Sequence, residues 1–366
     1  MAGSGFGTNF RITTWGETHG AGVGVVVDGC PAGLSLERED VQKYLDRRKP
    51  GQSKYTTQRK EGDQVEILSG IFEGRTTGTP ISMVVYNKDQ RSKDYSNIKD
   101  IYRPGHADFT FDMKYGFRDY RGGGRSSGRE TIGRVAAGAV AAKVLKELGI
   151  EIKAYAKAIA GIEVSKDHFD FAEMNNNPFN MPDKEAAKLV QEKADQMIKE
   201  MDSIGGIIEC QITGMPVGIG ETVFDKLDAE LSKAIMSIGS VKGFEIGDGF
   251  EAANLRGSEN NDDFICVDGK VEKETNHSGG VLGGMSDGSA IVFRAAIKPT
   301  PSIAQTQKTV NRDLDNVEIE IHGRHDPMIV PRAVVVVESM AAVTILDGVL
   351  KNLGATMDNI KKIYGE

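Results

Sequence analysis

The chain has 366 residues, a net charge of −8, 39% hydrophobic residues and 27% charged residues. This composition is ordinary for a globular protein of one large or two ordinary domains, and the acidic balance argues against a dedicated nucleic-acid binder. Three widely spaced cysteines without a CxxC pair indicate neither a zinc site nor a disulfide framework. No segment is as apolar and long as a signal segment or a membrane span, so the cytoplasm is the expected location and no membrane partner is expected.

Six segments have the residue pattern of strands. β-Branched runs and alternation of polar with apolar residues predict them at 23–28, 64–68, 81–86, 206–213, 289–298 and 316–321. Apolar residues at helical spacing predict four helices, at 129–148, 184–201, 225–238 and 332–353.

Local signals support the ends of these helices. Gly149 and Gly239 are stop signals, and Asp225 and Pro331 mark starts. The helix at 332–353 is apolar over much of its circumference and is expected to be buried. Because strands come in groups with helices between the groups, the sequence predicts an α+β fold and not a doubly wound sheet.

The segment 118–130 holds four arginines and four glycines immediately before a predicted helix. Glycine lets backbone N–H groups approach a ligand closely, and the arginine fork suits phosphate and carboxylate groups. A helix N-terminus also attracts anions. The segment therefore predicts a site for one or more small, multiply charged anions.

Further segments point to the same chemistry. Residues 47–60 hold six cations, and Pro50-Gly51 predicts that they form a loop. Arg324 lies within residues 322–327, and residues 298–302 end a predicted strand with a cation and two hydroxyls. A charge run is usually a solvated face, but here the runs accompany glycine turns and histidines, which favours a site.

Two histidines lie in glycine-marked turns, where side chains are expected at the edge of a cleft. His19 lies within residues 16–20, and His106 follows Arg103 by three residues. Histidine exchanges protons readily near neutral pH. A phosphate held by Arg103 would therefore have a proton donor nearby. Neither the dinucleotide-binding nor the P-loop glycine pattern is supported, and no cluster has metal-ligand spacing.

Read together, these segments resemble one family, chorismate synthase. Seven stretches match in order along nearly the whole chain, and their combination is far more specific than any one of them. They are 16–20, 47–53, 103–108, 118–130, 277–284, 298–300 and 323–327.

The resemblance implies a reaction and a fold. The reaction is a 1,4-elimination of phosphate from 5-enolpyruvylshikimate 3-phosphate that gives chorismate, the last step of the shikimate pathway. It implies a requirement for reduced FMN, with NADPH or an external flavin reductase as the source of electrons. The implied fold is a single-domain β-α-β sandwich over residues 1–366, with helices between antiparallel sheets, assembled as a homotetramer.

The resemblance also assigns roles to residues. It implies that His106 is the general acid for phosphate departure, that His19 protonates the reduced flavin, and that Asp326 assists removal of the C6 proton. The implied substrate-binding residues are Arg48, Lys54, Arg103, Arg129 and Arg324, and Lys54 stands where many members have arginine. The implied cofactor-binding residues are Arg125, Ser126, Ser127, Gly239, Ser240, Gly283, Lys298, Pro299, Thr300, Pro301, Ser302 and Arg324.

Two alternatives belong to other classes of protein. Residues 121–125 could act as an RGG-like RNA-binding element, but the element does not repeat and only 7% of residues are aromatic. An oxidoreductase with net hydride transfer is the second alternative, and it would consume reduced flavin in stoichiometric amounts.

Overall fold

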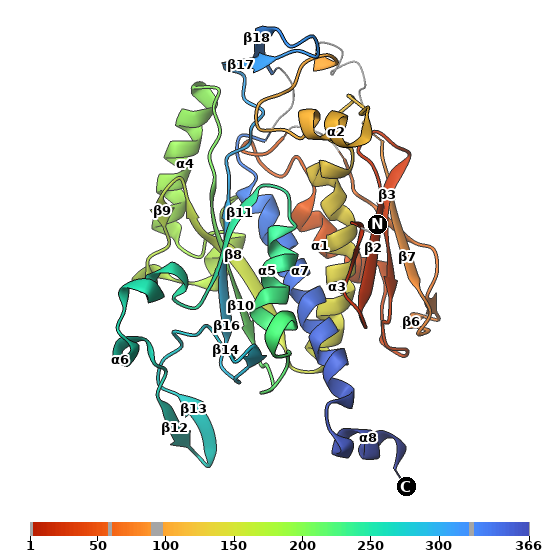
Figure 1. Ribbon diagram of the computed structural model, residues 1–366, viewed down its shortest axis with the longest axis vertical. Helices are drawn as coiled ribbons and strands as arrows, with labels where there is room; N and C mark the ends of the chain where they lie inside the picture. The colour runs from red at the N-terminus through yellow and green to blue at the C-terminus, as the bar shows by residue number, and fades with distance from the viewer. Residues whose placement is uncertain (1–2, 58–60, 89–97, 322–325, 366) are drawn as a thin grey trace.

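A computed structural model describes residues 3–57, 61–88, 98–321 and 326–365. Two five-stranded sheets form the outer layers of the molecule, and helices fill the space between them (Figure 1). All strand pairs in both sheets are antiparallel. The first sheet has the order β1 (Gly5–Phe6), β2 (Arg11–Gly16), β3 (Gly22–Asp28), β7 (Ile81–Tyr86), β4 (Val65–Ile67). The second has the order β11 (Val241–Ile246), β16 (Ile291–Ile297), β10 (Gly206–Thr213), β8 (Glu151–Ile159), β9 (Ile162–Glu163).

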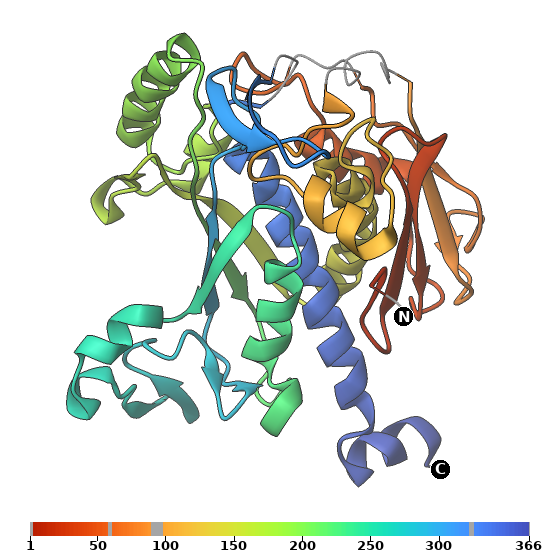
Figure 2. The same cartoon turned by 45° about the horizontal axis from the view of Figure 1, so that its top comes forward.

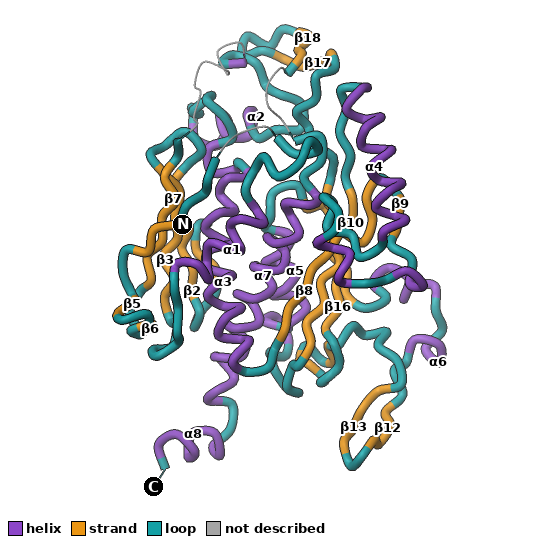
Figure 3. Tube along the Cα trace, turned by 180° about the vertical axis from the view of Figure 1, so that it is seen from behind, coloured by secondary structure: helices purple, strands orange, loops and turns teal. Residues whose placement is uncertain are grey.

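Four helices make up the middle layer, as Figures 1 and 3 show from opposite sides. They are α1 (Arg38–Arg48), α3 (Thr131–Glu147), α5 (Leu227–Met236) and α7 (Val330–Lys351). α3 contacts α1, α7 and a strand of each sheet, because its Ala, Gly and Val residues allow close approach on every side. One hydrophobic cluster includes residues of both sheets and of the middle layer. This arrangement confirms the predicted α+β fold with helices between antiparallel sheets.

The closest approach of the two central helices occurs at a glycine. A Cβ atom added to Gly138 on α3 would lie 2.2 Å from the Cβ of Ser339 on α7. Ser339 is completely buried, so neither helix can move aside cheaply. Gly138 is therefore required for the contact that forms the centre of the sandwich.

All six predicted strands and all four predicted helices are confirmed, with ends that differ by two residues or fewer. The helix expected at 332–353 is α7, which is buried over most of its length. The start of the helix expected at 225–238 was assigned to the wrong residue. Lys226 occupies the N-cap of α5 without a side-chain hydrogen bond, and Asp225 ends a short 3-10 turn before it.

The expectation that residues 47–60 form a loop was wrong at its beginning. Arg47 and Arg48 form the last turn of α1. Lys49 has extended backbone angles at the helix C-cap, as a residue before proline prefers, so the helix ends there. The correction matters because a helix holds these two arginines in fixed directions.

The remaining elements lie outside the three layers. α4 (Lys184–Lys199) packs near β9, and its N-cap Asp183 accepts hydrogen bonds from the N–H groups of Glu185 and Ala186. The other helices are α2 (Asp108–Tyr115), α6 (Gly257–Asn260) and α8 (Met357–Tyr364). The small hairpins are β5–β6 (Ile71–Phe72, Arg75–Thr76), β12–β13 (Phe264–Val267, Lys270–Lys273), β14–β15 (Val281–Leu282, Met285–Ser286) and β17–β18 (Thr306–Val310, Asn316–Glu320). α8 and the β12–β13 hairpin project from the body in Figure 1.

Among the described helices, one is long and apolar enough to cross a membrane by length and composition alone. It spans Val330–Gly354 and consists of α7 and the turn after it. Within its most apolar window, 78% is buried inside the protein. Its apolar surface is thus covered by α1, α3, α5 and strands β8 and β10 of the second sheet, as in the core helix of a globular protein.

Candidate active site

Most of the predicted site residues lie at one end of the sandwich, where α1 ends and α3 begins. This end is at the top of Figure 1, and Figure 2 turns it toward the viewer, with the orange α2 and the blue β17–β18 hairpin around it. Three groups of side chains can be distinguished there. They are centred on a buried arginine pair, on His106 and on the turn that carries His19.

The arginine pair consists of Arg48, at the end of α1, and Arg129, in the 3-10 turn Gly128–Glu130 that precedes α3. Both contact the carboxylate of Asp63. Arg48 Nη1 lies 2.7 Å from Asp63 Oδ2, and Arg129 Nη1 lies 3.0 Å from Asp63 Oδ1. The exposed fractions of the three side chains are 4%, 8% and 0%. Two cations thus share one fully buried carboxylate.

The remaining contacts of Arg48 hold it rigidly. Its Nε donates to Thr131 Oγ1 at 3.1 Å, and its Nη2 donates to the Gly128 carbonyl at 3.1 Å. Burial lowers the pKa of Arg48 to about 10, and nearby Asp63 acts against that effect. The group remains charged at neutral pH. Arg48 is therefore a fixed positive charge at the junction of α1 and α3.

Arg129 differs from Arg48 because one of its donors is unmatched. Its Nε donates to Asn87 Oδ1, and its Nη1 contacts Asp63. Its buried Nη2 has no hydrogen-bond partner among the residues that the structure describes, and lies 3.6 Å from Glu61 Oε2. Nη2 thus has an ion-pair partner in Glu61 but no acceptor at hydrogen-bond distance, which is costly for a buried charged donor.

Asp326 joins the arginine pair to two other loops. Its Oδ2 lies 2.7 Å from Arg332 Nη1, and its Oδ1 accepts from the backbone N–H of Thr57 at 2.8 Å. Arg332 Nε in turn donates to the carbonyl of Arg48 at 3.0 Å. The start of α7, the end of α1 and the loop around Thr57 are thereby connected.

His106 is held by both ring nitrogens. Nδ1 lies 2.9 Å from the Pro104 carbonyl and Nε2 lies 2.8 Å from Ser302 Oγ. Since a carbonyl only accepts, Nδ1 carries a proton, and the neutral ring therefore accepts from Ser302 through Nε2. Burial lowers the pKa of His106, and nearby Arg103 lowers it further. The ring is therefore neutral near pH 7 until an anion arrives.

Arg103 and Lys298 lie beside this histidine. Arg103 contacts Asp108 through Nε at 2.7 Å and through Nη2 at 2.8 Å. No hydrogen bond from its Nη1 is found in the described part of the chain. Lys298 Nζ donates to the Gly105 carbonyl at 3.0 Å. The surroundings of His106 are thus positive.

The His19 turn is connected to Arg129 through Asn87. Asn87 Nδ2 donates to the carbonyls of Glu17 and Gly20 at 2.9 Å each, while Asn87 Oδ1 accepts from Arg129. His19 is partly buried and close enough to Asp119 to lower the pKa of that carboxyl, although the hydrogen bond from Arg121 lowers it more. Asn87 is a functional candidate that sequence patterns did not reveal.

Arg125 is fully engaged by the protein. Its Nη1 donates to the Gly16 carbonyl at 3.1 Å, and its Nη2 contacts Thr14 Oγ1 at 2.8 Å, the Thr14 carbonyl at 3.1 Å and Ser4 Oγ at 3.2 Å. Its guanidinium fixes the Gly124–Ser126 turn to the end of β2. The neighbouring Ser126 is exposed, and Ser127 caps the turn by accepting from the N–H of Arg129.

The segment 298–302 lies next to the end of α5. The Lys298 N–H donates to the Ser240 carbonyl at 2.9 Å, and a Cβ added at Gly239 would meet no atom within 4 Å. Thr300 Oγ1 is buried and, within the described residues, has no hydrogen-bond partner. A buried hydroxyl without a hydrogen bond is compatible with a polar ligand near this segment.

Two predicted site residues, Gly283 and Lys54, do not join these groups. Gly283 is exposed in the β14–β15 turn, and the next residue accepts from the N–H of Leu227, which begins α5. Ser240 follows the other end of that ten-residue helix, about 15 Å away. Lys54 is exposed and contacts Asp195 of α4 at 2.7 Å. Arg324 lies outside the described residues.

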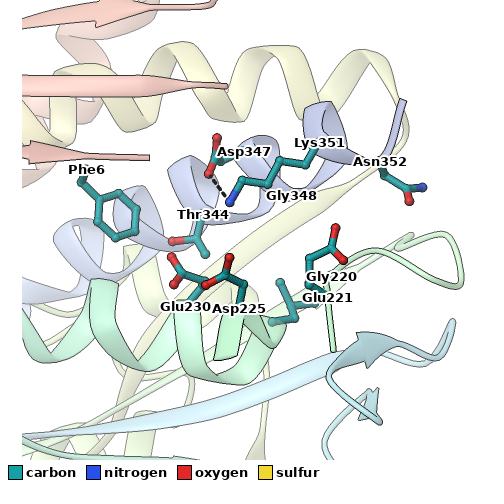
Figure 4. Close-up of a pocket in the computed structure, with 11 residues that line it drawn as sticks. Phe6, Gly220, Glu221, Asp225, Glu230, Thr344, Asp347, Gly348, Lys351 and Asn352 are labelled. Carbon is teal, nitrogen blue, oxygen red and sulfur yellow. Dashed lines mark ion pairs between the residues drawn. The ribbon is translucent and has the colours of Figure 1, made fainter. Parts of the chain in front are cut away.

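A small pocket opens at the opposite end of the molecule (Figure 4). Carboxylates of Glu221, Asp225, Glu230 and Asp347 line it, with Lys351 paired to Asp347 at 3.2 Å. Such a lining repels anions. The chemistry predicted from the sequence belongs to the other end.

The fold and the basic end define a class of protein. It is an α+β sandwich with buried arginines, unmatched donors and a titratable histidine at one end of its helical layer, which suits an enzyme acting on an anionic small molecule.

Comparisons with known proteins identify the family. A family model described as chorismate synthase matches residues 10–350. Among curated relatives, the chorismate synthase of Lachnospira eligens is 67% identical over 100% of both chains, and that of Methanococcoides burtonii is 56% identical over 96% of this chain and 97% of its own. A solved structure titled "Crystal Structure of Chorismate Synthase" superposes with a TM-score of 0.77 at 31% identity, covering 98% of this chain and 96% of that one. The chain belongs to the chorismate synthase family, so it is a carbon–oxygen lyase that acts on phosphates in the last step of the shikimate pathway.

Proposed function

We propose that the basic end of the sandwich is the place where 5-enolpyruvylshikimate 3-phosphate loses its phosphate. The unmatched Nη2 of Arg129 carries this proposal, because a buried guanidinium donor needs an acidic acceptor. The substrate offers two carboxylates and one phosphate. Arg48, Arg103 and Arg129 bind these groups, and Arg324 is proposed as a fourth contact on the resemblance alone.

His106 is proposed as the general acid for the departing phosphate. The ring is neutral at rest, so this role requires that the bound substrate raise the pKa of His106 until the ring is protonated. A phosphate dianion near the ring favours the imidazolium, whereas burial and Arg103 disfavour it. The hydrogen bond between Nδ1 and the Pro104 carbonyl keeps Nε2 as the atom that exchanges the proton.

Reduced FMN is proposed as the cofactor. The fit rests on Thr300 Oγ1, on the open space at Gly239 and on the cation of Lys298, all near Ser240. It would be held by residues 298–302, 239–240 and 125–127. Arg125 would contribute by fixing the Gly124–Ser126 turn in place. When bound, reduced flavin supplies transient electron donation and a basic nitrogen for the C6 proton.

His19 and Asp326 are proposed to act on protons beside that cofactor. His19 is partly buried in a turn fixed by Asn87, and Asp326 is held between Thr57 and Arg332. The backbone of the His19 turn is thus fixed by hydrogen bonds, and the carboxylate of Asp326 is itself held in place, as catalytic groups require.

We also propose the state in which the enzyme works. One continuous core supports a single domain over residues 1–366. Exposed apolar residues on the projecting elements, such as Phe264, Val271 and Ile363, support assembly with other copies into a homotetramer. The proposed location is the cytoplasm, with electrons for FMN supplied by NADPH through an external flavin reductase.

Anaerobic turnover tests the function. The protein is mixed with dithionite-reduced FMN and 5-enolpyruvylshikimate 3-phosphate, and chorismate absorbance and free phosphate are followed together. The expected result is equimolar chorismate and phosphate, with many turnovers per flavin. One flavin oxidised per product would indicate an oxidoreductase instead, and tight RNA binding with a steep salt dependence would favour the RNA-binding alternative.

A further inference from the structure

We propose that Asp63 is a positioning residue for the substrate, holding Arg48 and Arg129 as one rigid charged pair. The proposal rests on the function proposed above and adds a residue to which neither a motif nor the family resemblance assigns a role. Asp63 lies between α1 and β4, 15 residues after Arg48 and 66 residues before Arg129.

The geometry allows both arginines to be held at once. Each carboxylate oxygen contacts a different guanidinium, at 2.7 Å for Arg48 and 3.0 Å for Arg129. Because the contact to Arg129 uses Nη1, and Asn87 takes Nε, the unmatched Nη2 is left as the donor for the substrate. Asp63 thus determines that Nη2 is the nitrogen of Arg129 that remains available to hydrogen-bond the substrate.

Electrostatics require a carboxylate at this place. Two guanidinium groups that share one acceptor repel each other, and both are removed from water. The charged groups that influence Arg48 are Asp63 and Asp326, which stabilise its charge, and Arg129 and Arg332, which oppose it. A neutral side chain at position 63 would remove the one charge that contacts both members of the pair.

The protein positions Asp63 itself through α1. Gln42 Nε2 donates to the Asp63 carbonyl at 3.2 Å, and Gln42 Oε1 accepts from the N–H of Val65 at 3.0 Å. Asp63 has a left-handed backbone with φ of 43°, which aspartate and asparagine tolerate better than most residues. One helix therefore carries Arg48 and also fixes the residue that orients it.

Asp63→Asn is the sharpest test because it keeps the size and the backbone preference. The amide can accept from one arginine, but its NH₂ group faces the other, so one contact must be lost. The expected result is a rise of about tenfold or more in the dissociation constant for 5-enolpyruvylshikimate 3-phosphate, measured calorimetrically without flavin. The KM should rise in parallel, while affinity for FMN changes less than threefold.

Glu338→Gln is the matched control. Glu338 is a buried carboxylate on α7 that contacts Arg47, the neighbour of Arg48, at 2.6 Å and 2.9 Å. Its loss should lower the midpoint of urea unfolding without changing substrate affinity. If Asp63→Asn behaves like this control, losing stability with unchanged substrate affinity, Asp63 is only structural and the proposal is overturned.

A second variant covers the case in which Asp63→Asn does not fold. Asp63→Glu keeps the charge but extends it by one methylene, which moves both guanidinium groups. It should raise KM for the substrate more than it lowers kcat, and an unchanged KM would overturn the proposal. Failure of the wild type to release phosphate would instead reject the proposed function, so the two failures are distinguishable.

Discussion

Charge is buried at both ends of the helical layer, but in two different ways. At the lower end, Asp347 of α7 accepts the N–H groups of Thr8, Asn9 and Phe10 at 2.6–3.0 Å and also contacts Lys351 (Figure 4). At the upper end, Arg129 keeps a buried donor without an acceptor. Burial of a charge therefore does not by itself mark a site. At Arg129 the site is indicated by a buried donor without a hydrogen bond together with the other cations around it. The missing hydrogen bond is not enough alone, because among the described residues Asp287 Oδ2 is also buried without one and belongs to none of the three groups at the upper end.

The two ends also differ in their balance of charge. The lower pocket is lined by four carboxylates and one lysine, whereas at the upper end the cations Arg48, Arg103, Arg129, Arg332 and Lys298 outnumber the carboxylates Glu61, Asp63, Asp108 and Asp326 that contact them. A substrate with three acidic groups is attracted to one and repelled by the other. The comparison leads to predictions in which changes at the upper end alter catalysis or binding and changes elsewhere alter only stability.

The largest effect is expected from His106→Ala. Loss of a general acid should reduce turnover by roughly 10²–10⁴-fold. The measurement is the rate of chorismate formation at saturating substrate, with FMN affinity as the control. A variant that turns over at the wild-type rate would remove His106 from the mechanism and weaken the assignment of catalysis to the upper end.

Arg129→Ala should weaken substrate binding next most strongly. The change removes the unmatched donor and leaves Asp63 with one cation, and truncation of one partner of a buried charged pair costs about 2–5 kcal/mol. The dissociation constant should rise roughly 30-fold or more, measured calorimetrically. Arg47→Ala, in the last turn of α1, is the control, because Arg47 contacts Glu338 and no proposed ligand group. Equal affinities for the two variants would contradict the prediction.

Asp347→Ala should damage stability and spare catalysis. Three backbone N–H groups lose their acceptor, and the buried Phe10 N–H cannot turn to water. The expected loss is about 2–4 kcal/mol in the free energy of unfolding, measured by urea denaturation. KM and kcat of the folded fraction should stay within about twofold of the wild type. A change in KM would show that the two ends are coupled.

Gly138→Ala tests how tightly α3 and α7 pack in the helical layer between the two ends. Alanine normally suits a helix better than glycine, but here its methyl group would lie 2.2 Å from the Ser339 Cβ. Overpacking should destabilise the protein by about 1–3 kcal/mol. Gly128→Ala is the control, since a Cβ there meets no atom within 4 Å. If both variants have equal unfolding midpoints, α3 and α7 are not in the tight contact described.

The sequence predicted the sandwich well because its signals are local. β7 and β10 show as β-branched runs, and α3 and α7 as long apolar patterns. α1 was missed because its residues are mostly polar and its basic end resembles a loop. Arg47 and Arg48 show the limit of such reasoning. They are adjacent, yet successive helix residues point about 100° apart, so Arg47 reaches Glu338 and Arg48 reaches Asp63.

The candidate site was predictable only where a motif marks it. His106, Arg48 and Arg129 lie in such segments, but Asp63 and Asn87 are ordinary polar residues in sequence. Their importance comes from partners 15 to 70 residues away. These partners are Glu17 and Gly20 for Asn87, and the arginine pair for Asp63. Tertiary packing decides which of the distant polar residues become hydrogen-bond partners, and this cannot be read from local residue patterns.

The smallest expected effect is a pH dependence of stability that comes from His106. Burial and then Arg103 lower the folded-state pKa below the ordinary value of 6.5, so the folded protein binds a proton less readily than the unfolded chain. As the pH falls below about 6.5, the unfolded state is protonated first and stability is lost, by at most about 1.4 kcal/mol per pH unit, until the folded-state pKa is passed. Urea unfolding of the wild type and of His106→Gln, at intervals between pH 7.5 and 5, measures this contribution as the difference between the two curves of stability against pH.

The difference in the free energy of unfolding should be constant above pH 7 and should shift in favour of the glutamine variant as the pH falls. A parallel pair of curves would mean that the imidazole is as easily protonated in the folded site as in water. The positive surroundings inferred for His106 would then be wrong, and His106 would not need a bound anion in order to be protonated.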